Sequence, residues 1–304
     1  MPTPLVTPLV YLTVALVWAG GWIAGKVGVA AAPPLELSAV RYAIAGVLLL
    51  AITRLWRVPL PTGRLGLVAL AAAFGVLGYN AFVFVGLTLT PASDAALIVP
   101  TLVPVLTAVA ATSIGEPLTG NKVLGLVVSS AGAALVIATG GDLGGELSER
   151  RLAGDLLHLA GAACWAGYAT IGAVVLRGAS PLAYVTLTSC LGAAMLFPLG
   201  FLERGYTDVP SWTAVAWSAL GFMVVFATVV GFVLFYWAVR RFGAGLGSMV
   251  TYLVPVATLA LAFVVLGERP QPLQLVGGAV ILTGVRLATW RRRAGVPLAG
   301  TAPA

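Results

Sequence analysis

Aromatic and hydroxyl side chains near the middle of long uncharged stretches are the residues of this sequence best suited to bind a small organic molecule. Ring faces contact apolar parts of a ligand, while hydroxyl and amide groups orient its polar ends. Trp18, Trp22 and Lys26 have the i, i+4, i+8 spacing that places side chains on one helix face. The candidate binding residues are Trp18, Trp22, Tyr79, Asn80, Thr101, Trp165, Tyr168 and Tyr252. They predict a site for an amphipathic solute, unless the rings only pack between helices or face lipid.

Four charged residues, Lys26, Glu36, Arg41 and Asp94, fall near the outer ends of predicted helices in the first half of the chain. Charge inside hydrocarbon is costly and calls for a partner. One interpretation is an outer vestibule that receives the carboxylate and the ammonium of a zwitterion. The other is snorkelling at the membrane interface, with Lys26 pairing with Glu36 or Arg41 pairing with Asp94. The positions that correspond to Lys26, Glu36 and Arg41 in the second half are uncharged.

Proline residues inside two predicted helices are candidate hinges. Pro100, Pro104 and Pro255 each remove a backbone hydrogen bond, which frees a carbonyl and permits a bend. A bend near the middle of the membrane can serve as a gate hinge or expose backbone to a solute. A static kink is the alternative.

The sequence contains none of the motifs that would indicate catalysis or a bound cofactor. It has no P-loop, no histidine and cysteine cluster with metal-ligand spacing, and no serine, histidine and acid set beyond chance. No acidic residue falls at the centre of a predicted span, which disfavours proton antiport through a central carboxylate. We therefore expect no metal site, no cofactor and no enzyme activity.

These candidate residues lie in a chain with the composition of a polytopic membrane protein. Charged residues make up 9% of the sequence and hydrophobic residues 60%, against roughly 25% charged in a soluble domain. Residues 65–93 carry no charge, and comparable runs recur along the chain; a spanning helix needs about 20 apolar residues. The alternating polarity of membrane barrel strands is not present. We predict an all-α membrane protein with ten transmembrane helices, at about 9–29, 35–56, 65–86, 92–114, 121–139, 154–176, 181–202, 212–238, 243–265 and 271–290.

The distribution of basic residues orients these helices. Most loop arginine and lysine residues fall on the side that would also hold both termini, and basic loops stay in the cytoplasm. The net charge of +7 is thus spread over short loops, which argues against nucleic acid binding. The loop between the halves carries Asp142, Glu146, Glu149 and Asp155 and is expected outside. We predict a multi-pass protein of the cell inner membrane with both termini cytoplasmic.

The two halves of the chain repeat each other in sequence. Val-Trp-Ala-Gly at 17–20 recurs as Cys-Trp-Ala-Gly at 164–167, and Leu-Val-Pro-Val at 102–105 recurs at 253–256. Because each half has an odd number of predicted spans, the second copy enters the membrane from the other side, as in many transporters. The predicted units are a first five-helix repeat, an extracytoplasmic acidic linker, and a second five-helix repeat with a short basic cytoplasmic tail, at 1–140, 141–153 and 154–304.

These motifs together resemble the ten-helix EamA family of the drug/metabolite transporter superfamily. Trp-Ala-Gly-Gly-Trp at 18–22 with Lys26 is similar to the family's first-helix pattern, and Pro-Leu at 34–35 followed by Arg-Tyr at 41–42 is similar to its second-helix signature. Proline-bearing fourth and ninth helices, each followed by Gly-Glu, and glycine-rich fifth and tenth helices complete the resemblance. Among its members, the YddG-type amino-acid exporters are the nearest match. The resemblance implies a secondary transporter, commonly an exporter of small metabolites or amino acids.

We therefore expect export of small amphipathic metabolites, above all amino acids including aromatic ones, by alternating access between two inverted repeats. The partners would be that small-molecule substrate and the lipid bilayer, with the protein acting as a monomer. Two alternatives stay open, multidrug efflux and, from another class, an intramembrane enzyme or lipid-handling protein. An enzyme would require a polar catalytic cluster at one depth, which the sequence does not show.

Overall fold

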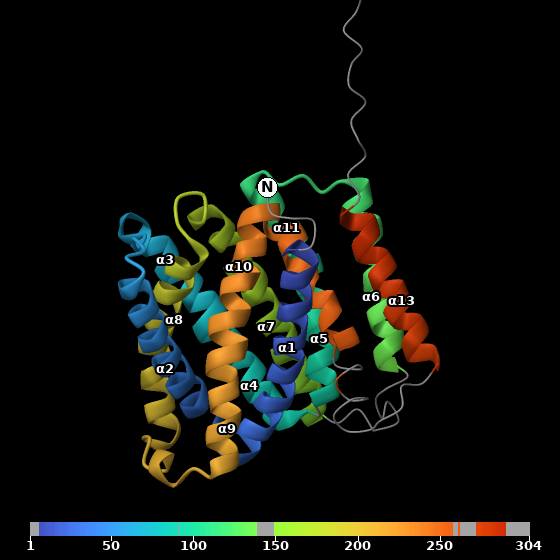
Figure 1. The fold of residues 1–304 in the computed structure, drawn as a ribbon. Coiled ribbons are helices and arrows are strands. Elements are labelled where there is room, and N and C mark those ends of the chain that lie inside the picture. Colours follow the sequence, from blue (N-terminus) through green and yellow to red (C-terminus); the bar gives the residue numbers. More distant parts are fainter. Residues whose placement is uncertain (1–5, 91, 139–148, 258–260, 262–271, 290–304) are drawn as a thin grey trace, which may run out of the picture.

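The computed structural model describes residues 6–90, 92–138, 149–257, 261 and 272–289. These residues form helices joined by short turns, with no strand among them, so the predicted all-α class is confirmed for this part of the chain (Figure 1). The helices run up and down in Figure 1, and α1 begins at the top. We call this end of the bundle the N-face.

The first half of the chain has two long helices followed by helices with irregular segments. A π-helical stretch, η2, separates α3 from α4, and α5 ends in the 3₁₀ segment η3. The elements are α1 (Val6–Ala31), α2 (Pro34–Leu55), η1 (Thr62–Arg64), α3 (Leu65–Ala72), η2 (Ala73–Gly78), α4 (Tyr79–Leu89), α5 (Ala92–Ala110), η3 (Ala111–Ile114) and α6 (Gly120–Ala138).

The second half also contains a π-helical stretch, η5, between α9 and α10. Because α7 begins at Glu149, the last residues of the predicted linker are helical, while residues 141–148 lie outside the described residues. The elements are α7 (Glu149–Val175), α8 (Pro181–Arg204), η4 (Val209–Ser211), α9 (Ala214–Phe222), η5 (Met223–Val230), α10 (Gly231–Phe242), α11 (Ala244–Gly247), η6 (Ser248–Tyr252) and α13 (Pro272–Thr289).

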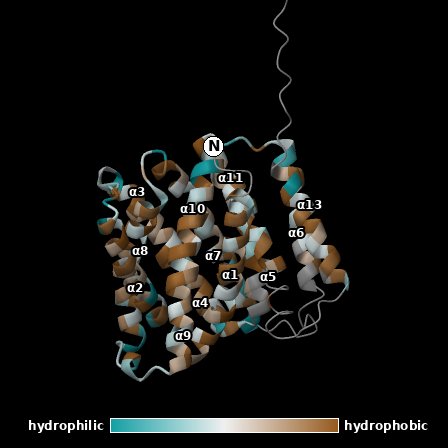
Figure 2. Cartoon of the chain, viewed as in Figure 1, coloured by the Kyte–Doolittle hydropathy of each residue, from teal (hydrophilic) through white to brown (hydrophobic). Residues whose placement is uncertain are grey.

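Within the described residues, six helical segments are long and apolar enough to cross a membrane. They are Val6–Ala31, Pro34–Leu55, Thr62–Leu89, Glu149–Val175, Pro181–Arg204 and Ala214–Phe242. Three shorter apolar helices accompany them, Ile98–Ile114, Ala244–Ala257 and Leu275–Ala288. Figure 2 shows hydrophobic colour along the helices and hydrophilic colour mainly near their ends. A membrane-spanning bundle is therefore supported, and the count of ten spans stays a prediction.

Pairs of helices in the bundle approach each other closely at glycine residues. The α2 helix packs along α8, and α6 packs along α13, beside it at one edge of Figure 1. A Cβ atom at Gly125 would lie 2.6 Å from the carbonyl oxygen of Gly284 across the α6–α13 contact. A Cβ atom at Gly46 would lie 3.2 Å from Sγ of Cys190 across the α2–α8 contact. Small residues at these positions let the backbones come close enough for dispersion attraction to hold the helices together in lipid.

Two contacts between the halves of the chain join a glycine of one half to an aromatic ring of the other. Gly20 in α1 packs against the ring of Phe222, and Gly167 in α7 packs against the ring of Phe74. Each half also contains one π-helical segment within a long helix, η2 between α3 and α4 and η5 between α9 and α10. A π-helical turn changes which side chains face inward and is common at functional sites.

Replacing Gly125 with alanine is predicted to destabilise the protein. The added methyl group would lie 2.6 Å from the backbone nitrogen of Ala288, and the two helices can relieve this contact only by separating. Overpacking of this kind costs about 1–3 kcal/mol, so the apparent melting temperature in detergent should fall. Gly221 on the exposed side of α9 is the matched control, because nothing lies within 4 Å of an added Cβ atom. Equal melting temperatures for Gly125→Ala and Gly221→Ala would contradict the close α6–α13 contact.

Candidate functional site

A cavity lies among α1, α2, α4, α5, α7, η6 and the helix that runs from α9 into α10. Its volume of about 80 Å³ is room for a few water molecules or a small organic group. Most of its lining is aromatic or aliphatic. The lining residues are Trp18, Gly21, Trp22, Gly25, Arg41, Tyr79, Val83, Phe84, Leu87, Val99, Pro100, Val103, Trp165, Met223, Ala227, Phe232, Thr251 and Val254.

Trp165 stands at the centre of the aromatic wall. Its ring centroid lies 5.3 Å from that of Trp18, 4.9 Å from that of Tyr79 and 5.2 Å from that of Phe232. The interplanar angles of 89° with Trp18 and 82° with Phe232 are the edge-to-face geometry that aromatic pairs prefer. The indole N–H of Trp18 also donates to the carbonyl of Ala227 in η5 at 3.1 Å. These contacts hold the rings as a rigid apolar surface.

The structure thus brings Trp18, Trp22, Tyr79 and Trp165 together from three different helices. Trp18 and Trp165 occupy equivalent positions of the sequence repeat. Their role in solute binding stays a prediction. Because they line one cavity, the prediction now refers to a defined site.

Arg41 lies in the cavity wall and not in a separate outer vestibule. Its side chain is only 6% exposed, and Nε donates to Oγ1 of Thr228 in η5 at 2.9 Å. Its Cζ atom lies 5.1 Å from the ring centroid of Tyr42 and 5.9 Å from that of Phe84, and ring faces attract a cation. No carboxylate among the described side chains pairs with it. The sequence predicts the depth of Arg41 in its helix, but depth alone does not reveal the direction of a side chain.

Two glycines of α1, Gly21 and Gly25, line the cavity. They differ in the space around them, since a Cβ atom at Gly21 would lie 3.3 Å from Cβ of Ala227. A Cβ atom at Gly25 would meet nothing closer than the ring of Phe84 at 3.8 Å. Their spacing is typical of close helix packing, which Gly21 provides against η5, whereas the missing side chain at Gly25 leaves room in the cavity.

Asn80 and Tyr168 do not line the cavity. Asn80 follows Tyr79 by one residue and therefore faces a different side of α4, where Nδ2 donates to the hydroxyl of Tyr42 and to the carbonyl of Val76. The Tyr168 hydroxyl shares a hydrogen bond with Thr188 at 2.9 Å, and its ring packs behind Trp165. Both are fully buried and hold the helices that carry the aromatic wall.

Tyr252 and Thr101 also lie away from the cavity lining. The Tyr252 hydroxyl shares a hydrogen bond with Ser130 of α6 at 2.8 Å, so Tyr252 connects η6 to the pair formed by α6 and α13. Thr101 is half-buried, although the adjacent Pro100 faces the cavity. Thr251, one residue before Tyr252, is the η6 side chain that lines it.

Lys26 caps a helix and does not pair with Glu36. Its Nζ donates to the carbonyls of Leu87 and Thr90 at 3.0 and 3.2 Å, at the C-terminal end of α4. A cation at this end of a helix satisfies unpaired carbonyls and opposes the helix dipole. The side chain of Asp94 lies outside the described residues, so its predicted pairing with Arg41 stays untested.

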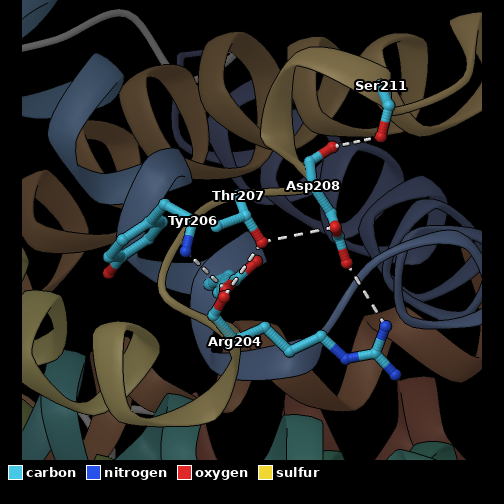
Figure 3. A network of polar contacts seen from close by, with 6 residues as sticks. Arg204, Tyr206, Thr207, Asp208 and Ser211 are labelled. Atoms are coloured by element: carbon cyan, nitrogen blue, oxygen red, sulfur yellow. Dashed lines mark hydrogen bonds and ion pairs between the residues drawn. The ribbon is translucent and has the colours of Figure 1, made fainter.

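Glu36 is fully buried and holds the turn that follows α8. Its Oε1 accepts the backbone N–H of Tyr206 at 2.9 Å, and Glu203 accepts two backbone amides of the first turn of α2. Figure 3 shows this turn, in which Arg204 and Asp208 form an exposed ion pair at 3.3 Å. Burial, with the nearby Glu36 and Glu203 carboxylates, raises the pKa of Tyr206 to about 12. Glu36 therefore has a structural role here and does not face the cavity.

The proline residues create a link between α5 and η6. Pro104 has no N–H to donate to the carbonyl of Pro100, four residues earlier. Thr251 Oγ1 donates to that carbonyl at 3.2 Å and replaces the missing helical bond. Pro100 lines the cavity, whereas Pro104 and Pro255 are buried outside its lining. Their action as hinges stays a prediction.

At the N-face of the bundle, hydrogen bonds from α1 and from the turn after η3 reach α11. The Tyr11 hydroxyl donates to the carbonyl of Leu246 at 3.3 Å. The Glu116 carboxylate accepts the backbone N–H groups of Ala244 and Gly245 at 2.6 and 3.0 Å. Gly243 has φ 85°, which favours glycine and turns the chain from α10 into α11 beside that carboxylate. These contacts hold α11 against the ends of α1 and η3 at the N-face.

Comparison with protein families matches the EamA-like transporter family over residues 6–138 and again over 152–290. This chain belongs to the EamA-like transporter family. It is a multi-pass membrane transporter, which confirms the resemblance found in the sequence motifs. The separate match of each half agrees with the sequence repeat.

Two relatives and one solved structure extend this finding. The "Uncharacterized transporter YyaM" of Bacillus subtilis is 32% identical over 71% of this chain and 70% of its own. The "Probable terminal-alkyne amino-acid exporter" of Streptantibioticus cattleyicolor is 30% identical over 90% of both chains. A crystal structure with 24% identity has a TM-score of 0.74 and covers 92% of this chain and 95% of its own, which shows a shared fold.

Replacing Glu116 with alanine is predicted to loosen the N-face. The variant removes a carboxylate acceptor from two amides of α11, and hydrogen bonds to a charged group contribute about 1.5–3 kcal/mol. Hydrogen–deuterium exchange of residues 243–248 should accelerate, while exchange in the 205–213 turn on the opposite face should not change. Glu149→Ala, at an exposed position in the first turn of α7, is the matched control. Unchanged exchange in Glu116→Ala would show that this carboxylate does not hold α11 in place.

Proposed function

We propose that this protein exports small amphipathic metabolites, and first of all amino acids with apolar or aromatic side chains, across the inner membrane. The observation that carries the proposal is a cavity in the bundle with an aromatic wall and a single guanidinium among its described lining residues. Ring faces suit an apolar side chain, and a cation suits a carboxylate. The name of the Streptantibioticus relative, a probable amino-acid exporter, is in accord with this class of solute. A closer relation to the YddG-type exporters is part of the same proposal.

Alternating access between two inverted five-helix repeats is the mechanism that we propose. It is supported by the family match of each half, by the ring contacts of Gly20 and Gly167, and by the π-helical segment in each half. In this mechanism the contacts of α11 at the N-face break when that face opens, and the opposite face then closes behind the solute. We place both termini in the cytoplasm and treat the protein as a monomer of ten spans.

The two alternatives fit the cavity less well. Multidrug efflux of cations calls for a carboxylate, whereas the charged group in the described lining is Arg41. An intramembrane enzyme or a lipid-handling protein calls for a polar catalytic cluster, whereas most of the described cavity lining is aromatic or aliphatic. Amino-acid export is therefore the function that the geometry favours.

Truncation of the aromatic wall is predicted to impair transport. Purified protein in liposomes should release labelled phenylalanine, and Trp165→Ala should raise the solute concentration for half-maximal flux about tenfold, because an aromatic contact contributes about 1.5 kcal/mol. Trp56→Ala is the matched control, since that side chain is 68% exposed at the end of α2 while Trp165 is 4% exposed. Equal flux in the two variants, at equal protein levels, would count against the cavity as the transport site. Absence of flux for every amino acid in the wild type would refute the proposed function.

Transport is also predicted to proceed without a proton gradient. No carboxylate lines the cavity among the side chains that the structure describes, so a central proton-binding acid is missing there. Flux of phenylalanine down its own gradient should be the same with and without a pH difference across the liposome. A strict requirement for a pH difference would assign the coupling to a carboxyl group elsewhere.

A further inference from the structure

The guanidinium of Arg41 has hydrogen-bonding capacity that its neighbours leave unused. A guanidinium carries five N–H donors. Among the residues that the structure describes, only Nε has a partner, the Thr228 hydroxyl at 2.9 Å. Nη1 and Nη2 are not among the fully buried polar atoms that lack partners, and Arg41 lines the cavity. The two terminal nitrogens are therefore presented to the cavity.

An unpaired cation in these surroundings is costly. The side chain is 6% exposed, and the rings of Tyr42 and Phe84 offset only part of the lost hydration. An anion that enters the cavity would complete the site. Two parallel N–H groups match the two oxygens of a carboxylate, which is the geometry that arginine offers and lysine does not.

We propose that Arg41 binds the carboxylate of the transported solute and selects carboxylate-bearing solutes over neutral and cationic ones of the same shape. This inference rests on the proposed transport function of the cavity. The ligand class is a small monocarboxylate with an apolar or aromatic side chain, whose apolar part faces the wall formed by Trp18, Tyr79 and Trp165. The ammonium group of an amino acid is not required by Arg41, so a deaminated acid is also recognised.

Thr228 positions the guanidinium for this contact. Its hydroxyl accepts from Nε, and it belongs to η5 of the second half while Arg41 belongs to α2 of the first. With Nε fixed on that side, the fork of Nη1 and Nη2 is held in one orientation. Thr228→Val keeps the shape and removes the acceptor, so it should weaken acid selection without abolishing it.

The test compares an acid with its amide. Binding of 3-phenylpropionate and of 3-phenylpropanamide is measured by tryptophan fluorescence in detergent, and both compounds compete for phenylalanine flux in liposomes. Wild-type protein should bind the acid about 10- to 100-fold more tightly than the amide, because a hydrogen bond to a charged group typically contributes that factor in affinity. Arg41→Gln should bring the ratio near one, and Arg41→Lys should keep part of it. Lys26→Gln is the matched control, because that ammonium caps α4 outside the cavity lining and the ratio should not change.

The outcomes separate this inference from the proposed function. An acid preference that survives in Arg41→Gln, or a wild-type ratio near one, would overturn the assignment of Arg41. If Arg41→Gln does not fold, Arg41→Lys and Thr228→Val provide the same comparison, and unchanged ratios in both would overturn it. A large gain of acid binding in Asp94→Asn would show that Asp94 already occupies the guanidinium, which also contradicts the proposal. Arg41-dependent acid binding without any flux would refute only transport, whereas flux with an unchanged ratio in Arg41→Gln would refute only the role of Arg41.

Discussion

Hydrocarbon offers no hydrogen-bond partner, and this constraint explains where most polar side chains of the bundle go. Lys26 caps carbonyls at the end of α4, Glu203 accepts the first amides of α2, and Thr251 replaces a bond that a proline removes. In each case a side chain satisfies a backbone group that is unpaired at a helix end or break. Because many polar side chains of the helix bundle bind its own backbone in this way, few remain to bind a solute.

The aromatic wall of the cavity depends on the same constraint. A π-helical turn displaces carbonyls from their regular helical partners, and in η5 the carbonyl of Ala227 accepts the indole N–H of Trp18. The unpaired carbonyl of η5 and the indole N–H of Trp18 thus satisfy each other's hydrogen-bonding requirement. Trp18 in turn packs edge-on against Trp165, so the orientation of the wall is determined by a backbone feature on another helix.

Hydropathy and charge predict the all-helical class of this protein, and mid-helix position predicts that Trp18, Trp22, Tyr79 and Trp165 gather around one space. Depth in a helix follows from counting residues, but the direction of a side chain does not. Asn80 differs from Tyr79 by one residue, yet it reaches Tyr42 of α2, and the π-helical turn just before it changes the rotation of the helix. Lys26 and Glu36 could not be placed from sequence either, because their partners are backbone groups of segments far away in the chain.

Differences between the two sequence repeats determine the polarity of the cavity. Trp18 and Trp165 are equivalent in the repeat, and both face the cavity. Arg41 and Thr188 are equivalent as well, but the Thr188 hydroxyl bonds to Tyr168 inside the core at 2.9 Å while Arg41 reaches the cavity. Two repeats with the same residues at the cavity would contribute two similar apolar surfaces, and a solute would then have no preferred orientation. Since only one half contributes a cation there, the described lining has a charged side and an uncharged side, and an amphipathic solute can satisfy both in only one orientation.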